Sequence, residues 1–117
     1  MAVLKFTEDN WDEFRVGVFR KIVYLKDIMT VIIEFRNGPW SAADPFHSHV
    51  HEQSTYIAKG EVILLCEGEL DQHLQEGDVF YIPSGVNHSI RVVSPMARLI
   101  DNFTPIREDF LSMNSEQ

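Results

Sequence analysis

The sequence predicts an all-β domain built as a sandwich or a barrel, and three observations support that prediction. The apolar residues form short runs rich in Val, Ile, Phe and Tyr. Glycine and proline recur at even intervals between these runs. No stretch combines a sustained helical period with capping residues at both ends. The expected strands are residues 16–24, 28–35, 54–58, 61–66, 78–82, 89–93 and 97–103.

Turn residues separate the expected strands in chain order. They are Asn37-Gly38-Pro39 after the second strand, Lys59-Gly60 after the third, Glu67-Gly68 after the fourth, Glu76-Gly77 before the fifth, Pro83-Ser84-Gly85 after it and Ser94-Pro95 after the sixth. The Glu67-Gly68 pair is typical of a tight hairpin, because glycine adopts the positive φ that such turns need. Helical structure is expected only as single turns near residues 9–14 and 107–111.

Length and composition indicate one domain over residues 1–117, since single cores usually reach roughly 100–200 residues before a chain divides. Ten Lys and Arg against eighteen Asp and Glu give a net charge of -8, which argues against nucleic acid or an anionic membrane as a partner. Cys66 is the single cysteine, so no internal disulfide forms. The apolar runs are too short to span a bilayer and no secretory signal is evident, so we expect a cytoplasmic protein.

Four of the five histidines fall in two short stretches, FHSHVHEQ at residues 46–53 and PSGVNH at residues 83–88. Side chains alternate between the two faces of a strand, so His47, His49 and Gln53 would share a face if the strand is regular. Glu52 would then point to the other side. Two imidazoles on one face, joined by a third from another strand, are typical of a pocket for a divalent metal ion.

These two stretches resemble the two motifs of the cupin family. Residues 47–60 read HSHVHEQSTYIAKG and resemble the first motif, and residues 77–88 read GDVFYIPSGVNH and resemble the second. The resemblance implies a small jelly-roll barrel, or double-stranded β-helix. It also implies one divalent ion, which could be Ni, Zn, Fe, Mn, Co or Cu. Its ligands by resemblance are His47, His49, His88 and Gln53, the last at a position where most cupins carry glutamate.

The glutamine at position 53 has a chemical consequence. Three neutral imidazoles and a neutral amide leave a divalent ion with its full positive charge, which favours an anionic ligand and Lewis-acid chemistry. Redox cycling is less favoured than at a site with a carboxylate ligand. The alternative is that Gln53 is a structural amide and that three histidines and water bind the metal.

Three residues near the C-terminal end are candidates for substrate chemistry. Asp101 and Phe103 share one face of the last expected strand; if it points inward, the carboxyl lies among apolar groups and suits proton transfer. Arg107 follows a proline and could fold back over the barrel mouth to bind a carboxylate. The alternatives are a buried ion pair or a capping role for Asp101, and a surface salt bridge with Glu108 or Asp109 for Arg107.

The pattern D-x-F-x-P-x-R-x-D-F at residues 101–110, together with the run H-x-H-x-H-E-Q, resembles the KdgF family of small cupins. That resemblance implies an enzyme of pectin and alginate breakdown that opens 4,5-unsaturated monouronates to 4-deoxy-5-keto-uronates. By resemblance Asp101 moves a proton, Arg107 holds the carboxylate of the sugar acid, and Phe103 packs on its ring.

Two alternatives remain open at the level of the sequence. One is another cupin chemistry on the same ligands, such as a dioxygenase or isomerase reaction, and the other is a metal-stabilised module that binds a small acid without turnover. Asp101 and Arg107 discriminate between them, because a catalytic role requires both to point into the barrel near the metal. We also expect a homodimer, which hides unpaired strand edges.

Overall fold

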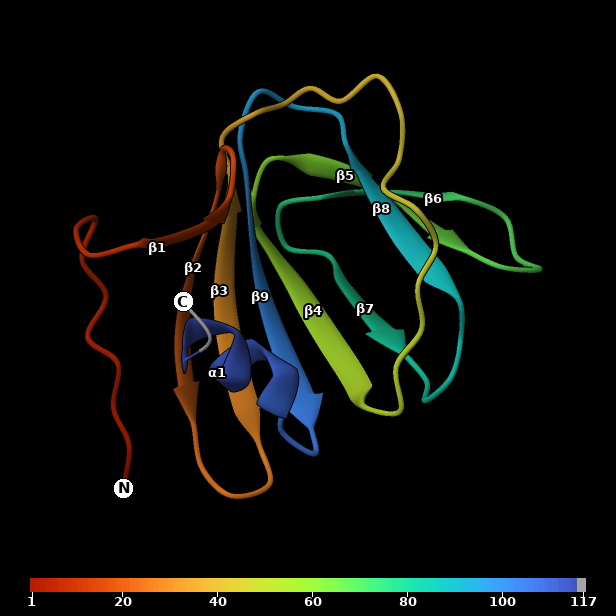
Figure 1. Ribbon diagram of the computed structural model, residues 1–117. Coiled ribbons are helices and arrows are strands. Elements are labelled where there is room, and N and C mark those ends of the chain that lie inside the picture. The colour runs from red at the N-terminus through yellow and green to blue at the C-terminus, as the bar shows by residue number, and fades with distance from the viewer. Residues whose placement is uncertain (116–117) are drawn as a thin grey trace.

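Two antiparallel sheets face each other in the computed structural model, which describes the backbone of residues 1–115 and the side chains of residues 1–111 (Figure 1). The large sheet has the order β1 (Asp12–Arg15), β2 (Val18–Tyr24), β3 (Met29–Phe35), β9 (Ala97–Thr104), β4 (Glu52–Lys59) and β7 (Val79–Ile82). The small sheet has the order β6 (Gln72–Gln75), β5 (Glu61–Cys66) and β8 (His88–Val92). The helix α1 (Glu108–Ser115) follows β9. The prediction of an all-β jelly-roll fold is confirmed.

All seven expected strands are present, but two further strands lie where the sequence did not predict them. Residues 12–15 form β1, so the single helical turn expected near residues 9–14 is wrong. Residues 72–75 form β6, where no strand was expected. Each has four residues and one half-buried side chain, Phe14 or Leu74, so neither carries the alternating apolar pattern of a core strand. The turn expected near residues 107–111 is confirmed and continues as α1.

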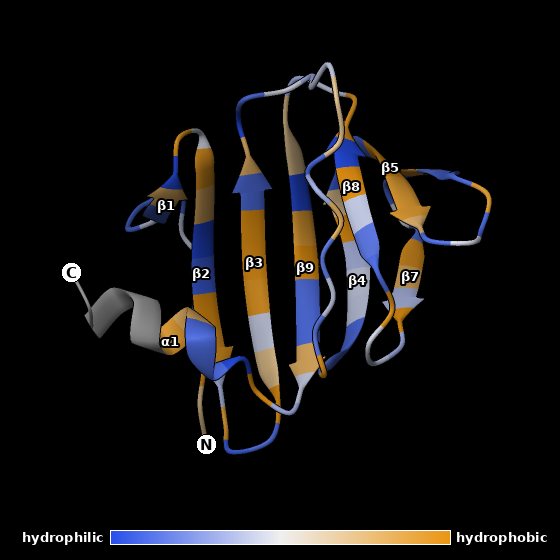
Figure 2. Ribbon diagram, turned by 45° about the vertical axis from the view of Figure 1, so that its right-hand side comes forward, coloured by the Kyte–Doolittle hydropathy of each residue, from blue (hydrophilic) through white to orange (hydrophobic). Residues whose placement is uncertain are grey.

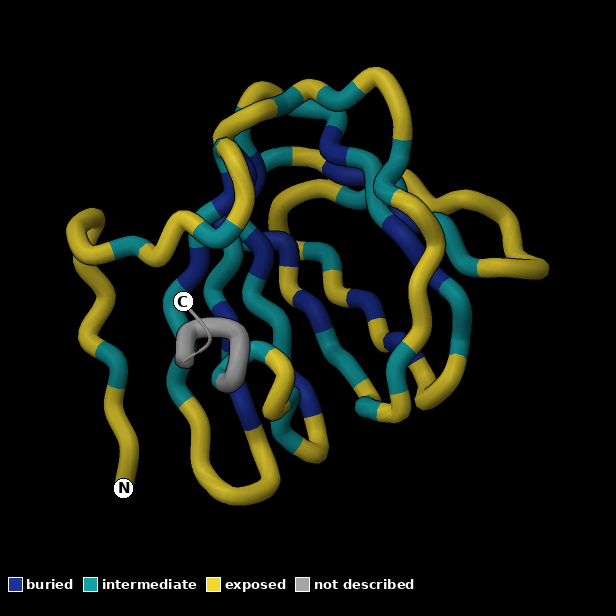
Figure 3. Tube along the Cα trace, viewed as in Figure 1, coloured by how far each residue is buried: buried dark blue, intermediate teal, exposed yellow. Residues whose placement is uncertain are grey.

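The core lies between the two sheets, because apolar and polar side chains alternate along the strands (Figure 2). Buried positions line the inside of both sheets, and exposed positions gather in the connections and at the edges (Figure 3). The central core cluster consists of Val18, Phe35, Ile57, Val62, Leu64, Phe80, Ile82, Val92, Ala97 and Leu99.

One connection in the fold accepts only glycine. Gly60 joins β4 to β5 with φ of 82°, in the left-handed region where residues with a Cβ are strained. A Cβ at this position would also collide with the backbone carbonyl of Met96. The chain can therefore reverse tightly here and carry β4 and β5 into different sheets.

The helix α1 lies against the inner face of β2, β3 and β9 and extends the core at that end (Figure 1). Phe110 and Leu111 of α1 pack with Met29, Val31 and Phe103. No helix among the described residues is long and apolar enough to cross a membrane. The position of α1 brings residues just after β9 back toward the space between the sheets.

Candidate metal centre

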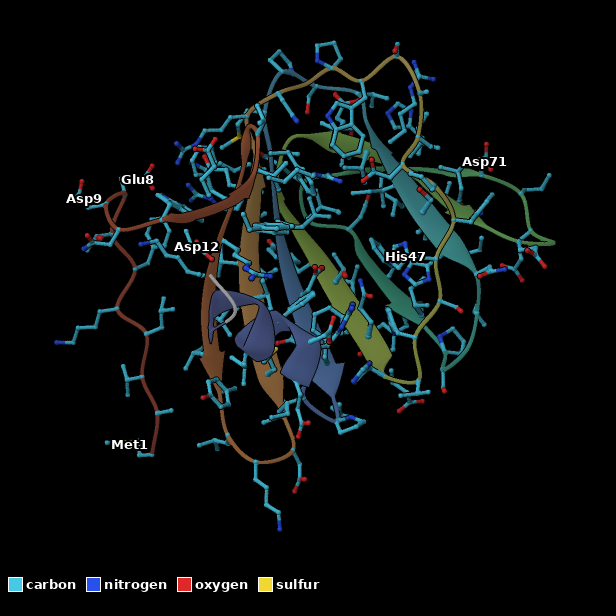
Figure 4. The ribbon with its side chains drawn as sticks, in the orientation of Figure 1. Met1, Glu8, Asp9, Asp12, His47 and Asp71 are labelled. Carbon is cyan, nitrogen blue, oxygen red and sulfur yellow. The ribbon has the colours of Figure 1, made fainter. Side chains whose placement is uncertain are left out.

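Three histidines meet between the start of β8 and the segment that precedes β4. His47 and His88 exchange two backbone hydrogen bonds of 3.0 and 2.9 Å, so the segment that contains His47 is held in register with the start of β8. Figure 4 shows where His47 lies in the molecule. The ring centroids of His47 and His88 are 4.4 Å apart, and His49 lies 5.0 Å from His88. The candidate ligand atoms of all three rings lie within 4.8 Å of one another, so these side chains could hold one metal ion.

Backbone carbonyls fix the orientation of two of the rings. His49 Nδ1 lies 2.9 Å from the carbonyl of His51, and His88 Nδ1 lies 2.8 Å from the carbonyl of Val86. A carbonyl only accepts, so each Nδ1 carries a proton and each neutral ring presents a bare Nε2. At His49 this Nε2 faces the amide oxygen of Gln53, so two lone pairs lie side by side, as they would around a shared cation. Burial lowers the pKa of His49 and of His88, which keeps both rings neutral at pH 7. Neutral, oriented imidazoles are the form in which histidine binds metals.

Gln53 adds an amide oxygen to this cluster. Its Oε1 lies 3.1 Å from Nε2 of His49. The alternation argument for this residue does not apply, because residues 50 and 51 form a bend and β4 begins only at Glu52. Gln53 nevertheless points inward from β4 and contacts His49, while Glu52 is exposed as expected.

A cavity of about 260 Å³ adjoins the histidines and brings together residues distant in sequence. Its polar lining includes His47, His88, Gln53, Asp101 and Arg107, and Phe103 forms part of its apolar wall. Asp101 and Arg107 therefore both face the interior next to the histidine cluster. Among the predicted site residues, His49 is the one that does not line this cavity; its ring packs edge-on against Phe103 at 5.8 Å.

Asp101 is half-buried and lines the cavity. Its Oδ1 accepts a 2.6 Å hydrogen bond from the hydroxyl of Thr55. Burial raises the pKa of Asp101 to about 6, although the Thr55 hydrogen bond and the charge of Arg107 act in the opposite direction. A carboxyl group with this pKa can gain or lose a proton near neutral pH, which is what a proton-transfer role needs.

Arg107 forms the salt bridge that was considered as its alternative role, and it also lines the cavity. Its Nε and Nη2 donate to Asp109 at 3.2 and 2.7 Å, and its guanidinium lies over the ring of Phe110 at 4.2 Å. Although burial opposes ionisation, the hydrogen bond and charge of Arg107 keep the pKa of Asp109 below its ordinary value. Two of five N–H groups are used in these bonds, so the guanidinium retains donors for an anion in the cavity.

Sequence reasoning missed Thr55, which connects the amide to the carboxylate. Gln53 Nε2 donates to Thr55 Oγ1 at 2.9 Å, and Thr55 in turn donates to Asp101. The residue is fully buried on the inner face of β4. Alternation along the expected strand 54–58 could have placed it near Gln53, but nothing local to residue 55 indicates its second partner.

Comparisons with known proteins show the family to which the chain belongs. Residues 36–100 match the cupin domain family. The chain is 32% identical over 105 residues to the pectin degradation protein KdgF of Dickeya dadantii, covering 89% of this chain and 93% of that protein. The structure of KdgF from Halomonas sp. matches with a TM-score of 0.77 and 32% identity, over 88% of this chain and 94% of that one. An RmlC-like cupin from Shewanella frigidimarina matches with a TM-score of 0.78 and 31% identity, over 91% and 93% of the two chains. The chain therefore belongs to the cupin family and, within it, to the KdgF family.

Proposed function

We propose that this protein is a metal-dependent cupin enzyme that linearises 4,5-unsaturated monouronates, the small acids left by pectin or alginate breakdown, to 4-deoxy-5-keto-uronates. The observation that carries the proposal is the cavity where the histidine cluster, Asp101 and Arg107 meet. A metal-binding group, a carboxyl with a pKa of about 6 and a guanidinium are the functions that isomerisation of a sugar acid needs. The relationship to a pectin degradation protein supports the same substrate class.

The donor set fits a divalent metal ion. Backbone carbonyls that bind Nδ1 orient the rings of His49 and His88, so that their Nε2 atoms can bind a metal. The His47 imidazole and the amide oxygen of Gln53 lie beside them and complete the donor set. We propose His47, His49, His88 and Gln53 as the four ligands of one ion among Ni, Zn, Fe, Mn, Co and Cu. Because all four donors are neutral, the bound ion would supply a Lewis acid with its full charge.

Each remaining residue has one task in the proposed reaction. Arg107 binds the substrate carboxylate with its remaining N–H donors, and Phe103 packs against the sugar ring. Ring opening breaks the bond between the anomeric carbon and the ring oxygen, removes a proton from the anomeric hydroxyl and adds one at C4 as the enol becomes a ketone. No atom is gained or lost overall. Asp101 is the group that holds or moves the proton, since its pKa lies near neutrality.

A direct assay tests the proposal. Purified protein loaded with metal is added to a freshly lyase-generated unsaturated monouronate, and the absorbance of the conjugated double bond is followed. We expect loss of absorbance well above the rate in buffer, and an aldehyde and a ketone in the product by NMR. Binding of the uronate without any acceleration would refute the enzymatic proposal and support a non-catalytic binding module.

We also propose a homodimer formed through the outer face of the large sheet. Tyr56, Val79 and Tyr81 are exposed on that face, on the adjacent strands β4 and β7. A groove of about 500 Å³ lies beside them between β9, β4 and β7. An exposed apolar patch on a sheet face is typical of a protein interface. Pairing two such faces would bury the patch on both copies.

A further inference from the structure

We propose that Thr55 is a positioning residue that sets which end of the Gln53 amide faces the histidines, through a hydrogen-bond relay from Gln53 to Thr55 to Asp101. This inference rests on the metal centre proposed above. It assigns a function to a fully buried side chain that is not among the residues lining the cavity. It also gives a structural reason for an amide, in place of a carboxylate, at position 53.

The register of the large sheet builds the relay. Thr55 of β4 lies directly across from Asp101 of β9, and Gln53 lies two residues earlier on the same face. The two hydrogen bonds measure 2.9 Å from Gln53 to Thr55 and 2.6 Å from Thr55 to Asp101. Thr55 is 0% exposed, so within the described structure water does not reach its hydroxyl. Each hydrogen-bonding position of the hydroxyl therefore has to be used within the protein.

The direction of the relay follows from counting protons. An ionised carboxylate only accepts hydrogen bonds, so the Thr55 hydroxyl donates its single hydrogen bond to Asp101. The oxygen of Thr55 is then left to accept, and the NH₂ group of Gln53 is the donor that it meets. That bond turns the carbonyl oxygen of Gln53 toward Nε2 of His49, at 3.1 Å. The amide orientation is thus dictated by Asp101, two hydrogen bonds away.

A glutamate at position 53 would conflict with this relay. Its carboxylate carries no proton for Thr55, so two carboxylates would compete for the one proton of a fully buried hydroxyl. Either Asp101 would take up a proton or one hydrogen bond would be lost. An asparagine at position 101 resolves the conflict, because its NH₂ group donates to Thr55 and frees the hydroxyl proton for the carboxylate at position 53. The chemical identities of residues 53 and 101 are therefore coupled through the hydroxyl of residue 55.

The first test measures metal affinity of the metal-free full-length protein, by competition for Zn²⁺ or Ni²⁺ against a chromophoric chelator. We expect Thr55→Val to weaken binding about 10-fold, the usual range for a lost partner of a metal ligand. Thr55→Ser keeps the hydroxyl and should stay within about threefold of wild type. Thr30→Val is the matched control, since Thr30 bonds Asn102 at 2.6 Å on the outer face of the same sheet. It should leave affinity unchanged.

Two results would overturn the inference. One is wild-type affinity in Thr55→Val, and the other is equal weakening in Thr55→Ser and Thr55→Val. Failure of the wild-type protein to bind either ion would overturn the metal centre and the relay together. Failure of the uronate assay alone would leave the relay standing, because the affinity measurement involves no turnover.

A double-mutant cycle covers the case in which Thr55→Val does not fold. We expect Gln53→Glu and Asp101→Asn together to bind metal at least about 10-fold more tightly than the sum of the single effects predicts. Simple charge repulsion between Asp101 and the carboxylate introduced at position 53 would also contribute to this coupling. Repeating the cycle with Thr55→Ser and, where it folds, Thr55→Val separates the two causes. The relay predicts coupling retained with serine and reduced with valine, and a cycle with no coupling in the wild-type background would contradict it.

Discussion

Asp101 makes the stability of the metal-free protein depend on pH in a direction that can be measured. Its pKa rises from 3.8 to about 6 on folding, so the folded state holds more protons than the unfolded state between these values. This group therefore lowers the free energy of unfolding as pH rises from about 4 to about 6, by up to about 3 kcal/mol. Asp101→Asn should remove that loss. Urea unfolding of both proteins with chelator present, at a series of pH values, measures the difference.

The free energy of unfolding has to be compared between wild type and Asp101→Asn, because other carboxyl groups titrate in the same pH range. Asp109 has a lowered pKa and stabilises the fold above its ordinary titration range, so its contribution has the opposite sign. It is present in both proteins and cancels in the difference. A stability difference that stays constant from pH 4 to pH 7 would show that burial does not perturb Asp101 as described.

His49 should be indispensable for metal binding. His49→Ala removes one imidazole from the cluster, together with the ring that lies 3.1 Å from the amide oxygen of Gln53. We therefore expect the variant to lose its bound metal during dialysis, as measured by elemental analysis. His73→Ala is the matched control, because His73 is 62% exposed on β6 and pairs with Glu61. Metal content equal to wild type in His49→Ala would remove this residue from the ligand set.

Arg107 should affect turnover without affecting the metal. Arg107→Ala removes the guanidinium that faces the cavity, and a lost bidentate contact to a carboxylate should lower kcat/KM for the uronate at least about 100-fold. Metal content and the far-UV spectrum should remain those of wild type. Arg36→Ala serves as the control, since Arg36 pairs with Glu34 and stacks on Phe19 away from the cavity. Unchanged kcat/KM in Arg107→Ala would exclude a role in substrate binding.

Residues of the candidate site differ in how visible they are in the sequence. His47, His49 and His88 stand out because imidazole is uncommon and two of them are two positions apart. Asp101 and Arg107 were identified from a pattern spanning the end of β9, and their position beside the cavity depends on α1 folding back. Thr55 has no local signature. Its function depends on a β4–β9 register that joins residues 46 positions apart, and a sequence pattern does not contain that register.

At the scale of the element, core strands were predictable and edge strands were not. β3 and β5 bury alternating apolar side chains, so their composition alone indicates them. β1 and β6 lie at the edges of their sheets and are mostly exposed, so pairing with a neighbour, and not their own composition, makes them strands. Near β1, where a single helical turn was expected over residues 9–14, Asn10 adopts φ of 62° and turns the chain.

The helix α1 is anchored to β2 by a buried arginine. Arg20 is 2% exposed, donates to the carbonyl of Phe110 at 3.3 Å and lies over the rings of Phe14 and Phe110. Arg20→Met should remove the anchor and lower the free energy of unfolding by about 2–4 kcal/mol, because a buried hydrogen bond and cation–π contacts are lost. Hydrogen exchange in residues 108–111 should accelerate.

A matched substitution separates this anchor from a general effect of charge removal. Arg15→Met removes a guanidinium that bonds Asp44 at 3.1 Å on the exposed surface, where an ion pair contributes about 0–1 kcal/mol. Its stability should stay close to wild type. Equal destabilisation by the two substitutions, or unchanged exchange in α1 of Arg20→Met, would mean that Arg20 does not hold the helix.

At the scale of the whole molecule, the site exists because the two-sheet fold gathers four separate parts of the chain. The segment before β4 supplies His47 and His49, β4 supplies Gln53 and Thr55, β8 supplies His88, and β9 with α1 supplies the residues for substrate. The inner surface of the large sheet combines two apolar clusters with the polar side chains of Gln53, Thr55 and Asp101. The apolar clusters stabilise the fold, so the sheet can also carry buried, oriented polar groups that would be costly elsewhere.

The outer surface of the large sheet leads to the prediction about assembly. Tyr81 is 77% exposed on β7, next to Tyr56 and Val79, so a charge placed there would have to be buried in the proposed dimer. Tyr81→Glu should therefore shift the protein from dimer toward monomer in light scattering at micromolar concentration. Leu70→Glu is the control, because Leu70 is 86% exposed in the turn between β5 and β6, away from this face.

Both variants should keep the wild-type metal affinity, since neither side chain belongs to the histidine cluster. A wild-type protein that is monomeric at these concentrations, or a Tyr81→Glu variant that dimerises as wild type does, would show that this face is not the interface.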